Sequence, residues 1–348
     1  MKRILSIDFG TTTTAFAVTT NQSAFEPEMI EIDGKTTTET CLRLDASGSQ
    51  IELLGADSWE HMDEAPERTF FDFKLKISDK TPFTVGSGRQ MTACDLARIF
   101  LSKLREKIET QAYGNSPLEQ NISTTVIGYP ATWTEIQKEA TLKVARDAGF
   151  PCVMGCEEPI GALYFHRYKN EFPIEADIHL VVYDFGGGTS DVCVMRASPN
   201  KHPQVLATAG LAEVGGKFFD ERLCQHFTQQ ICEELSLTEL PESDLRSLRR
   251  EAKRIKEKLS LAIENRDDAV RLIIPMLFVK KSKHEIKLAR KDFENICGDL
   301  MEPFLDPMWH AVNKAGLEGE KVNILKIRQT KKSSEICQNS PKKGLFLA

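Results

Sequence analysis

The chain has 348 residues, of which 41% are hydrophobic and 28% are charged, and its formal net charge is −6. This mixture is typical of a soluble folded protein, and the acidic balance argues against general attraction to nucleic acid or anionic membranes. Asp8 interrupts the first apolar run too early for a signal peptide, and no apolar stretch approaches the ~20 residues of a membrane span. The nine cysteines lack zinc-type spacing, so we expect reduced thiols and a cytoplasmic protein.

In chain order, the apolar periodicity predicts alternating strands and helices. The first strand pair spans 4–18, and a second spans 180–194. Between them we expect helices over 95–110 and 160–168, a strand over 124–129, and a further helix that Thr132 and Glu135 cap and Gly149 ends. That helix should bury one face, made of Ile136, Ala140, Val144 and Ala148.

After the second pair, a helix following Gly215 and Gly216 should turn four apolar residues inward: Phe219, Leu223, Phe227 and Ile231. A charged helix over 242–262, strands over 270–279 and 285–288, and a long helix over 290–315, weakened at Pro303 and Pro307, complete the pattern. Such alternation predicts α/β lobes with central sheets.

Two segments of the chain look alike. ILSIDFGTTTTAFAV, from residue 4, and LVVYDFGGGTSDVCV, from residue 180, each read as strand, tight turn and strand. Their acids, Asp8 and Asp184, lie 176 positions apart (184 minus 8). Two copies of one unusual hairpin predict a duplicated fold with two similar lobes.

The composition of the two turns suits phosphate chemistry. Glycine allows backbone N–H groups to approach an anion closely, and successive turn amides form an anion-binding concavity. Carboxylates beside a phosphate favour Mg²⁺, for which Asp8 and Asp191 are the candidates, while Asp184 is suited to orienting a water molecule. The alternative is two ordinary hairpins whose glycines only serve the turns. Rival phosphate motifs are absent: there is no GxxxxGK[ST], no GxGxxG that opens a helix, and no H-R-D loop.

Five segments resemble, in order, the ATPase domain of the DnaK-type heat-shock chaperones over about residues 1–320: IDFGTTTT, VIGYPATWTEIQKEAT, EEPIGAL, VVYDFGGGTSDV and VGGKFFDERL. The resemblance implies an α/β, actin-like ATPase fold of the ribonuclease H-like type, duplicated into two lobes. Lobe I would span 1–169 and lobe II 170–320. ATP or ADP and Mg²⁺ are the implied cofactors, held between the two turns.

The resemblance also assigns residues. It implies catalytic roles for Lys74, Glu158, Asp184 and Thr189, and metal binding by Asp8 and Asp191. Lys76 is the alternative to Lys74 if the alignment slips, and Pro130 matches the proline that relays the nucleotide state. Nucleotide-binding positions are implied at Gly10, Thr11, Thr12, Gly186, Gly187, Gly188, Gly215, Gly216, Lys256 and Ser260. Read without the family, the lysines are ordinary surface residues and Glu158 is an acid at a helix N-terminus.

Three departures from the family pattern stand out. Lys138 occupies a position where the family has arginine, which has a different hydrogen-bond geometry. Lys253 and Glu257 reverse the charges expected beside the nucleobase. From Glu320 onward seven Lys or Arg face two acids, so we expect a divergent, disordered basic tail over 321–348, an incomplete second lobe and no peptide-binding domain. A frameshift near Leu325 or a truncated gene would account for this.

The first functional hypothesis is an ATP-binding and ATP-hydrolysing chaperone domain whose activity the incomplete lobe weakens. The second is an inactive remnant that binds partners such as a J-domain co-chaperone or a nucleotide-exchange factor. The third is a small-molecule kinase of the same fold. None of them calls for nucleic acid, a membrane or a bound peptide substrate.

Overall fold

A computed structural model describes residues 3–19, 27–169, 174–199, 201–211, 215–264, 269–277, 282–318, 322–327 and 336–337. The chain divides into two compact units. The first unit comprises Met1–Ile178 with Met195–Thr208, and the second comprises His179–Val194 with Ala209–Ala348.

The main sheet of the first unit has the order β11-β10-β1-β2-β3, with β4 also beside β2. Its strands are β1 (Arg3–Phe9), β2 (Thr13–Thr19), β3 (Pro27–Met29), β4 (Thr37–Glu39), β10 (Ile122–Tyr129) and β11 (Val153–Glu157). β1 pairs antiparallel with β2 and parallel with β10. In β1 and β2, alternate side chains such as Leu5, Ile7 and Phe16 are buried, as expected when one sheet face is covered.

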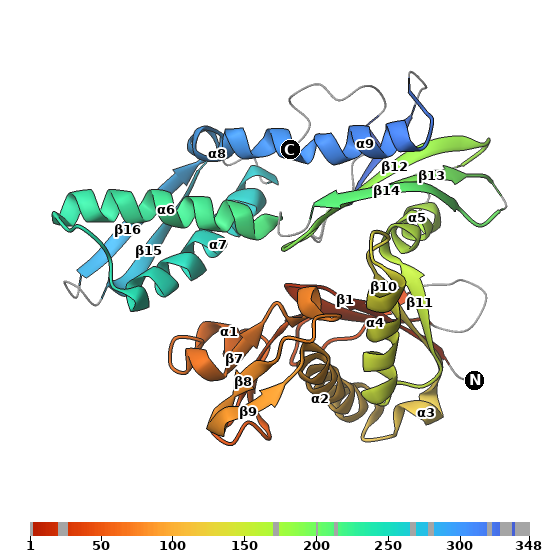
Figure 1. The fold of residues 1–348 in the computed structure, drawn as a ribbon, viewed down its shortest axis with the longest axis horizontal. Helices are drawn as coiled ribbons and strands as arrows, with labels where there is room; N and C mark the ends of the chain where they lie inside the picture. Colours follow the sequence, from red (N-terminus) through yellow and green to blue (C-terminus); the bar gives the residue numbers. More distant parts are fainter. Residues whose placement is uncertain are drawn as a thin grey trace. The chain divides into compact units, whose positions relative to one another are not determined.

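Helices cover this sheet, and α2 (Ala93–Tyr113) and α4 (Glu135–Asp147) lie side by side (Figure 1). α2 begins with a capping box of Thr92 and Asp95 and ends at Gly114, whose φ is 58°. The shorter α3 (Leu118–Asn121) precedes β10, and α5 (Glu158–Tyr168) follows β11 directly. Phe100, Leu104 and Ile108 of α2 are fully buried and form much of the core.

Two details of α4 correct the sequence prediction. Its capping box is formed by Thr134 and Gln137, not by Thr132 and Glu135, because Pro130 and the turn after it delay the helix. Ile136 is 73% exposed and so lies off the inner face, since the later start moves it into the first, solvent-facing turn. Gly149 follows the helix in the left-handed conformation, φ 87°, as predicted.

Smaller elements fill the region between β4 and α2. A three-stranded sheet has the order β6-β5-β7, and β8 pairs with β9. The bounds are β5 (Cys41–Leu44), β6 (Ile51–Leu54), β7 (Thr69–Phe71), β8 (Phe83–Val85), β9 (Arg89–Met91), α1 (Ala56–Glu60), and the 3₁₀ helices η1 (Pro66–Arg68), η2 (Phe73–Lys76) and η3 (Gly86–Gly88).

The second large sheet has the order β14-β13-β12-β17-β18. Its strands are β12 (Ile178–Phe185), β13 (Ser190–Ala197), β14 (Gln204–Leu211), β17 (Asn323–Ile327) and β18 (Ile336–Cys337). β12 pairs with β17 in parallel, as β1 does with β10. Read from the opposite edge, the first sheet runs β3-β2-β1-β10-β11, so the two sheets repeat one arrangement and the predicted duplication is confirmed.

The outer strand marks where the repeat ends. β11 has five residues and pairs in parallel with β10, whereas β18 has two and pairs antiparallel with β17. The two sheets therefore differ at this outer edge. The predicted tail, 321–348, otherwise lies outside the described residues apart from 322–327 and 336–337.

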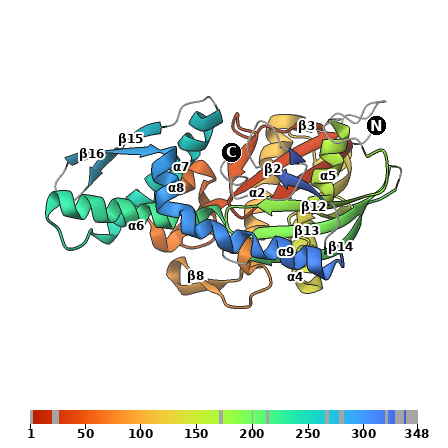
Figure 2. The same cartoon turned by 90° about the horizontal axis from the view of Figure 1, so that it is seen from above.

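Another part of the second unit packs helices on a β-ladder: α7 contacts β15 and β16, α8 contacts β16, and α6 packs on α7 and α8 (Figure 2). The elements are α6 (Gly216–Leu235), α7 (Glu242–Glu264), β15 (Ala269–Leu277), β16 (Ser282–Ala289), α8 (Arg290–Cys297), η4 (Gly298–Phe304) and α9 (Asp306–Lys314). The four predicted inward residues of α6 are buried. The long helix expected over 290–315 is broken, because Pro303 lies in η4 and Pro307 sits in the first turn of α9.

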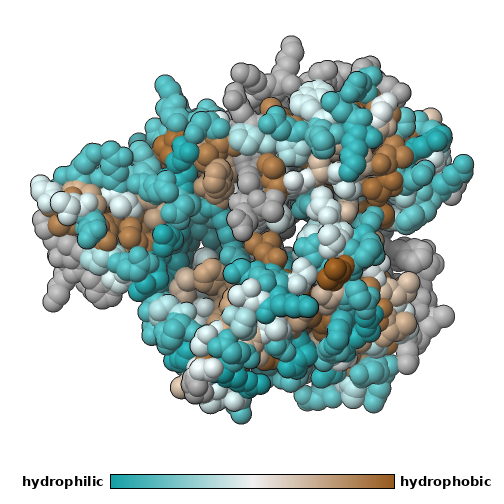
Figure 3. Space-filling model, in the orientation of Figure 1, coloured by the Kyte–Doolittle hydropathy of each residue, from teal (hydrophilic) through white to brown (hydrophobic). Residues whose placement is uncertain are grey.

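Most of the face shown in Figure 3 is hydrophilic, with hydrophobic side chains in separate groups. Among the helices of the described ranges, none combines the length and the apolar character that crossing a membrane demands.

Candidate functional site

The first turn (residues 10–13) joins β1 to β2. The backbone N–H of Gly10 donates to the carbonyl oxygen of Thr13 at 3.0 Å. A Cβ atom at residue 10 would lie 2.4 Å from that oxygen, so only glycine allows this closure. Thr12 Oγ1 is buried, and no described residue gives it a hydrogen-bond partner.

The second turn (residues 186–189) joins β12 to β13 and repeats the same closure. The N–H of Gly186 donates to the carbonyl oxygen of Thr189 at 3.0 Å. Tyr183 precedes Asp184, and Ser190 precedes Asp191. The hydroxyl oxygens of Tyr183 and Ser190 lie 2.7 Å apart and link β12 to β13. Burial is the main reason that the pKa of Tyr183 rises to about 12. Both predicted strand–turn–strand units are therefore present.

The loop before α6 supports the second turn. The N–H of Gly216 donates to Gly186 at 3.0 Å, and that of Lys217 donates to Gly187 at 2.9 Å. A Cβ on Gly215 would lie 2.7 Å from the carbonyl oxygen of Gly186. The predicted glycine groups 186–188 and 215–216 thus pack backbone to backbone, which explains the absence of side chains there.

Asp184 and Asp191 lie on the two strands that flank the second turn. Asp184 is the last residue but one of β12, and Asp191 is the second residue of β13. Both side chains are half-buried, and Gly188 is buried within the turn. The hairpin therefore carries an acid on each side of a run of turn amides.

Lys74 is the most enclosed of the charged candidates. It is 3% exposed, and its Nζ lies 3.0 Å from Glu158 Oε1. The rings of Phe9 and Trp133 also face this ammonium group, with centroids at 5.9 and 5.3 Å. Lys76, the alternative, is exposed and lies over the ring of Phe83.

Local backbone geometry explains how Lys74 comes to be buried. Asp72 has a left-handed conformation, φ 61°, and starts the 3₁₀ turn η2. Phe73, fully buried, packs against Phe9 and Phe100 with ring centroids 6.3 and 5.7 Å away. The anchored aromatic ring holds the short turn in place, so the adjacent lysine enters the interior instead of the solvent.

Glu158 begins α5, where Pro159 occupies the first turn and the helix dipole favours a carboxylate. The residue has room because Gly128 on β10 lacks a side chain. A Cβ there would lie 3.2 Å from Glu158 Cγ. Gly128 and Trp133 both shape this site and were not singled out by sequence reasoning, although both lie in the quoted segment VIGYPATWTEIQKEAT.

Asp8 is the last residue but one of β1 and lies beside the same cluster, and its pKa is raised to about 6. The side chain retains solvent access, so crowding by surrounding protein atoms, not complete enclosure, is the main cause. Repulsion from Glu158 raises this pKa further, while attraction to Lys74 lowers it. The three charged groups therefore form one electrostatic cluster in the first unit.

Lys256 and Ser260 lie one turn apart on α7, but their side chains have different surroundings. Lys256 Nζ donates to the carbonyl oxygen of Gly216 at 2.7 Å and lies 2.6 Å from Asp220 Oδ1, so it belongs to the glycine loop. Ser260 is exposed, and its hydroxyl donates to the Lys256 carbonyl oxygen within α7. Lys253 and Glu257, whose charges are the reverse of those expected, lie on the same helix. The distance from Lys253 Nζ to Glu257 Oε1 is 3.9 Å.

The relay positions lie at the junction of β10 and α4. Pro130 immediately follows β10. Lys138 pairs with Glu135 at 2.9 Å and with Glu157 at 3.7 Å, and its ammonium lies over the ring of Tyr129. The lysine thus already bridges α4 to the residue before Glu158.

The sequence predicts metal binding by two carboxylates, Asp8 and Asp191. Within the described ranges, no group of three His, Cys, Asp or Glu side chains is arranged to ligate a metal. Mg²⁺ characteristically takes one or two carboxylates and completes its shell with phosphate and water. Asp8 lies next to the first turn in the first unit, and Asp191 lies next to the second turn in the second unit.

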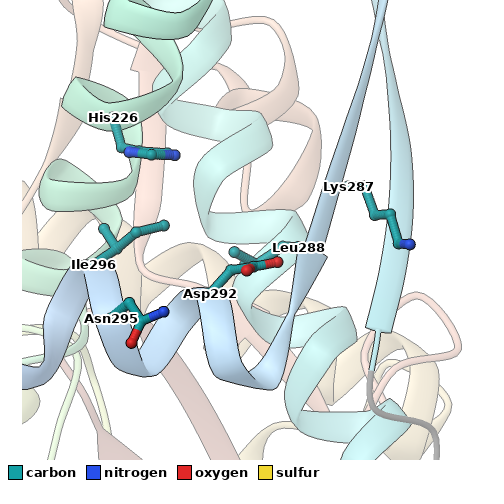
Figure 4. A pocket seen from close by; sticks show the side chains of 6 residues that line it. All are labelled: His226, Lys287, Leu288, Asp292, Asn295 and Ile296. Carbon is teal, nitrogen blue, oxygen red and sulfur yellow. The ribbon is translucent and has the colours of Figure 1, made fainter.

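One pocket of the second unit lies apart from these residues. It has a volume of about 310 Å³ and is lined by His226 of α6, Lys287 and Leu288 of β16, and Asp292, Asn295 and Ile296 of α8 (Figure 4). Its lining includes none of the predicted site residues.

The chain also matches a known protein family. The family model for Hsp70 protein matches residues 4–327, which includes both hairpins and the lysine, glutamate and glycine-loop positions described above. The domain of that family is an ATP-binding chaperone domain with an actin-like ATPase fold, in agreement with the repeated α/β sheets. The chain belongs to the Hsp70 family of heat-shock chaperones.

Proposed function

We propose that this chain binds ATP or ADP together with Mg²⁺ and hydrolyses ATP slowly. The main support is that the two turns close with the same Gly N–H to Thr carbonyl bond and that a buried lysine–glutamate pair lies beside the first of them. We assign phosphate binding to Gly10, Thr11 and Thr12 of the first turn and to Gly186, Gly187 and Gly188 of the second. Gly215 and Gly216 hold the second turn.

In hydrolysis, a water oxygen bonds to the γ-phosphorus, the bond from that phosphorus to the bridging oxygen breaks, and ADP and inorganic phosphate leave. Lys74 neutralises charge that develops on the transferred group. Glu158 and Asp184 orient the water and accept its proton, and Thr189 adds a hydroxyl donor. Bound Mg²⁺, held by Asp8 and Asp191, would supply further charge neutralisation.

We also propose that Lys256 and Ser260 contact the base and ribose of the nucleotide. Lys256 serves Gly216 and Asp220 in the present arrangement, so a contact with nucleotide would be made in addition to these bonds or by exchanging them. Comparing the affinities for ATP and GTP would show whether α7 selects the base.

The proposal extends to organisation and partners. Lobe I would span 1–169 and lobe II 170–320, each with one of the repeated sheets. Members of the family generally work with J-domain proteins and nucleotide-exchange factors, and we propose such partners for this chain. The eight cysteines whose side chains the structure describes are free thiols, which supports a reducing, cytoplasm-like compartment.

The direct experiment compares Lys74→Ala with Lys76→Ala, because one lysine is buried beside Glu158 and its neighbour is exposed. Nucleotide binding is measured by calorimetry with Mg²⁺ present, and turnover by phosphate release. We expect Lys74→Ala to keep binding and lose turnover by about 100-fold or more, as for loss of a preorganised charge, and Lys76→Ala to retain both. Absence of Mg·ATP binding by the unaltered chain would reject the function, and unchanged turnover in Lys74→Ala would reject the lysine's role.

A further inference from the structure

We infer that Thr40 is the positioning residue of the first turn. It follows β4 and precedes β5, and it is 2% exposed. No feature of the sequence points to it, since it lies among several threonines in a region without a motif. The inference rests on the proposed function, because it concerns how the turn is held for phosphate.

Thr40 holds the first turn at two points. Its hydroxyl donates to the carbonyl oxygen of Gly10 at 2.8 Å, and its backbone N–H donates to the carbonyl oxygen of Thr12 at 2.8 Å. The hydroxyl of Thr14 lies 2.9 Å from that of Thr40. A hydroxyl has one proton, and Thr40 gives its proton to Gly10, so Thr14 is the donor in this second contact. The result is a buried chain of hydrogen bonds from Thr14 through Thr40 to Gly10.

These bonds determine which way the turn amides point. In a planar trans peptide unit, the carbonyl and the following N–H point in opposite directions. Holding the Gly10 carbonyl on Thr40 therefore directs the Thr11 N–H away from Thr40. The bond to Thr12 does the same for the Thr13 N–H. Fixed amide directions are what an anion-binding turn requires, because a rotated peptide would present a carbonyl oxygen to the phosphate.

The second turn is held in an equivalent way by other residues. There, the carbonyls of Gly186 and Gly187 accept from the N–H groups of Gly216 and Lys217 at the start of α6. In both turns the leading glycine carbonyl is thus taken by a donor outside the turn. The first unit uses one threonine where the second unit uses a helix N-terminus.

The test uses three variants and one ligand, Mg·ADP, with affinity measured by calorimetry. Thr40→Val removes the hydroxyl and keeps the shape, Thr40→Ser keeps the hydroxyl, and Thr69→Val is the matched control. Thr69 is also buried, and its hydroxyl donates to the Ala65 carbonyl oxygen at 2.9 Å in the same unit. We expect Thr40→Val to weaken Mg·ADP binding roughly three- to tenfold, the worth of one hydrogen bond. Thr40→Ser should restore it, and Thr69→Val should leave it unchanged.

Thermal unfolding of each variant is recorded beside the affinity. Equal loss of affinity in Thr40→Val and Thr69→Val would overturn the inference, because it would reflect general loss of stability. Unchanged affinity in Thr40→Val, with the unaltered chain binding normally, would also overturn it while leaving the proposed function intact. If Thr40→Val does not fold, Thr14→Val serves in its place. Thr14→Val removes only the hydroxyl that donates to Thr40, so we expect the affinity for Mg·ADP to fall by less than tenfold. An unchanged affinity would count against the inference.

Discussion

The ammonium group of Lys74 lies 3.0 Å from the carboxylate of Glu158, although 84 residues separate them in the chain. Lys74 comes from a 3₁₀ turn after β7, and Glu158 from the first turn of α5. The lysine is almost fully enclosed and the glutamate mostly so, with side-chain exposures of 4% and 19%. Taking both charges out of water is costly, and a pair kept under those conditions is a candidate for chemistry more than for stability.

This relationship predicts a strong coupling between the two residues. Glu158→Gln removes the carboxylate that pairs directly with the buried ammonium of Lys74, so we expect a loss of roughly 3 kcal/mol in the free energy of unfolding. The double variant Lys74→Met, Glu158→Gln should be more stable than Glu158→Gln alone, because the unpaired charge is gone. Urea unfolding measures both. Glu135→Gln, which alters an exposed partner of Lys138, serves as the control and should change stability by under about 0.5 kcal/mol. Lys74→Met alone completes the cycle, and additive effects of the two single variants would contradict the coupling.

Gly128 is expected to set the position of Glu158. In Gly128→Ala the new methyl carbon would lie 3.2 Å from Glu158 Cγ, so the carboxylate must shift by a few tenths of an ångström. Because catalytic geometry tolerates little displacement, phosphate release should slow by roughly tenfold while the variant stays folded. Gly161→Ala is the comparison, since that glycine of α5 has open space around it and the change should stabilise the helix by about 0.5–1 kcal/mol. Equal turnover in the two variants would argue against this role for Gly128.

Gly215 should be intolerant of any side chain. In Gly215→Ala the Cβ would lie 2.7 Å from the Gly186 carbonyl oxygen and 2.9 Å from the Gly187 carbonyl carbon, both of them backbone atoms. The second turn and the loop must then separate, at a cost of roughly 1–3 kcal/mol. We expect a lower unfolding midpoint together with weaker Mg·ADP binding. Gly298→Ala, where no atom lies within 4 Å of the new carbon, should leave both unchanged. A Gly215→Ala variant with normal affinity would show that the contact does not matter for binding.

Asp8 gives the stability of the ligand-free chain a distinct pH dependence. Its folded-state pKa is raised from 3.8 to about 6, so the folded state disfavours the carboxylate form. The stabilisation linked to the proton is fully present below the unfolded-state pKa and is lost as pH rises through about 6. Asp8→Asn removes the charge, so it should stabilise the ligand-free chain above pH 6, and this gain should shrink between pH 6 and 4. Denaturant unfolding at a series of pH values tests this.

Asp45 provides a control of opposite sign for that experiment. Its pKa is lowered, mainly by the backbone N–H of Gln50 and then by the Ser47 hydroxyl and the Ser49 N–H. Its stabilisation is therefore present above the unfolded-state pKa and is lost as pH falls through the lower folded-state value. Asp45→Asn should destabilise the chain at neutral pH, and that difference should vanish in acid. A gain in Asp8→Asn that does not vary with pH would refute the account of Asp8.

Much of this molecule followed from local sequence. The two D-F-G segments predicted strand–turn–strand units and their duplication, because strand propensity, turn glycines and apolar alternation act over a few neighbouring residues. The inward face of α6 followed in the same way, whereas the long helix expected over 290–315 is divided into α8, η4 and α9. Helix starts were less secure: α4 begins two residues later than Thr132 and Glu135 suggested, since several nearby side chains are competent caps.

Tertiary structure decided what no local pattern contains. Lys74 and Lys76 are two residues apart and chemically identical, yet only Lys74 is buried against Glu158, because the packing of Phe73 turns it inward. Thr40 resembles its neighbouring threonines in sequence, and only the fold brings its hydroxyl to Gly10. Lys256 is directed to Gly216 by the packing of α7 on α6. Burial and long-range hydrogen bonds depend on which distant segments meet, and that information becomes local only when the chain has folded.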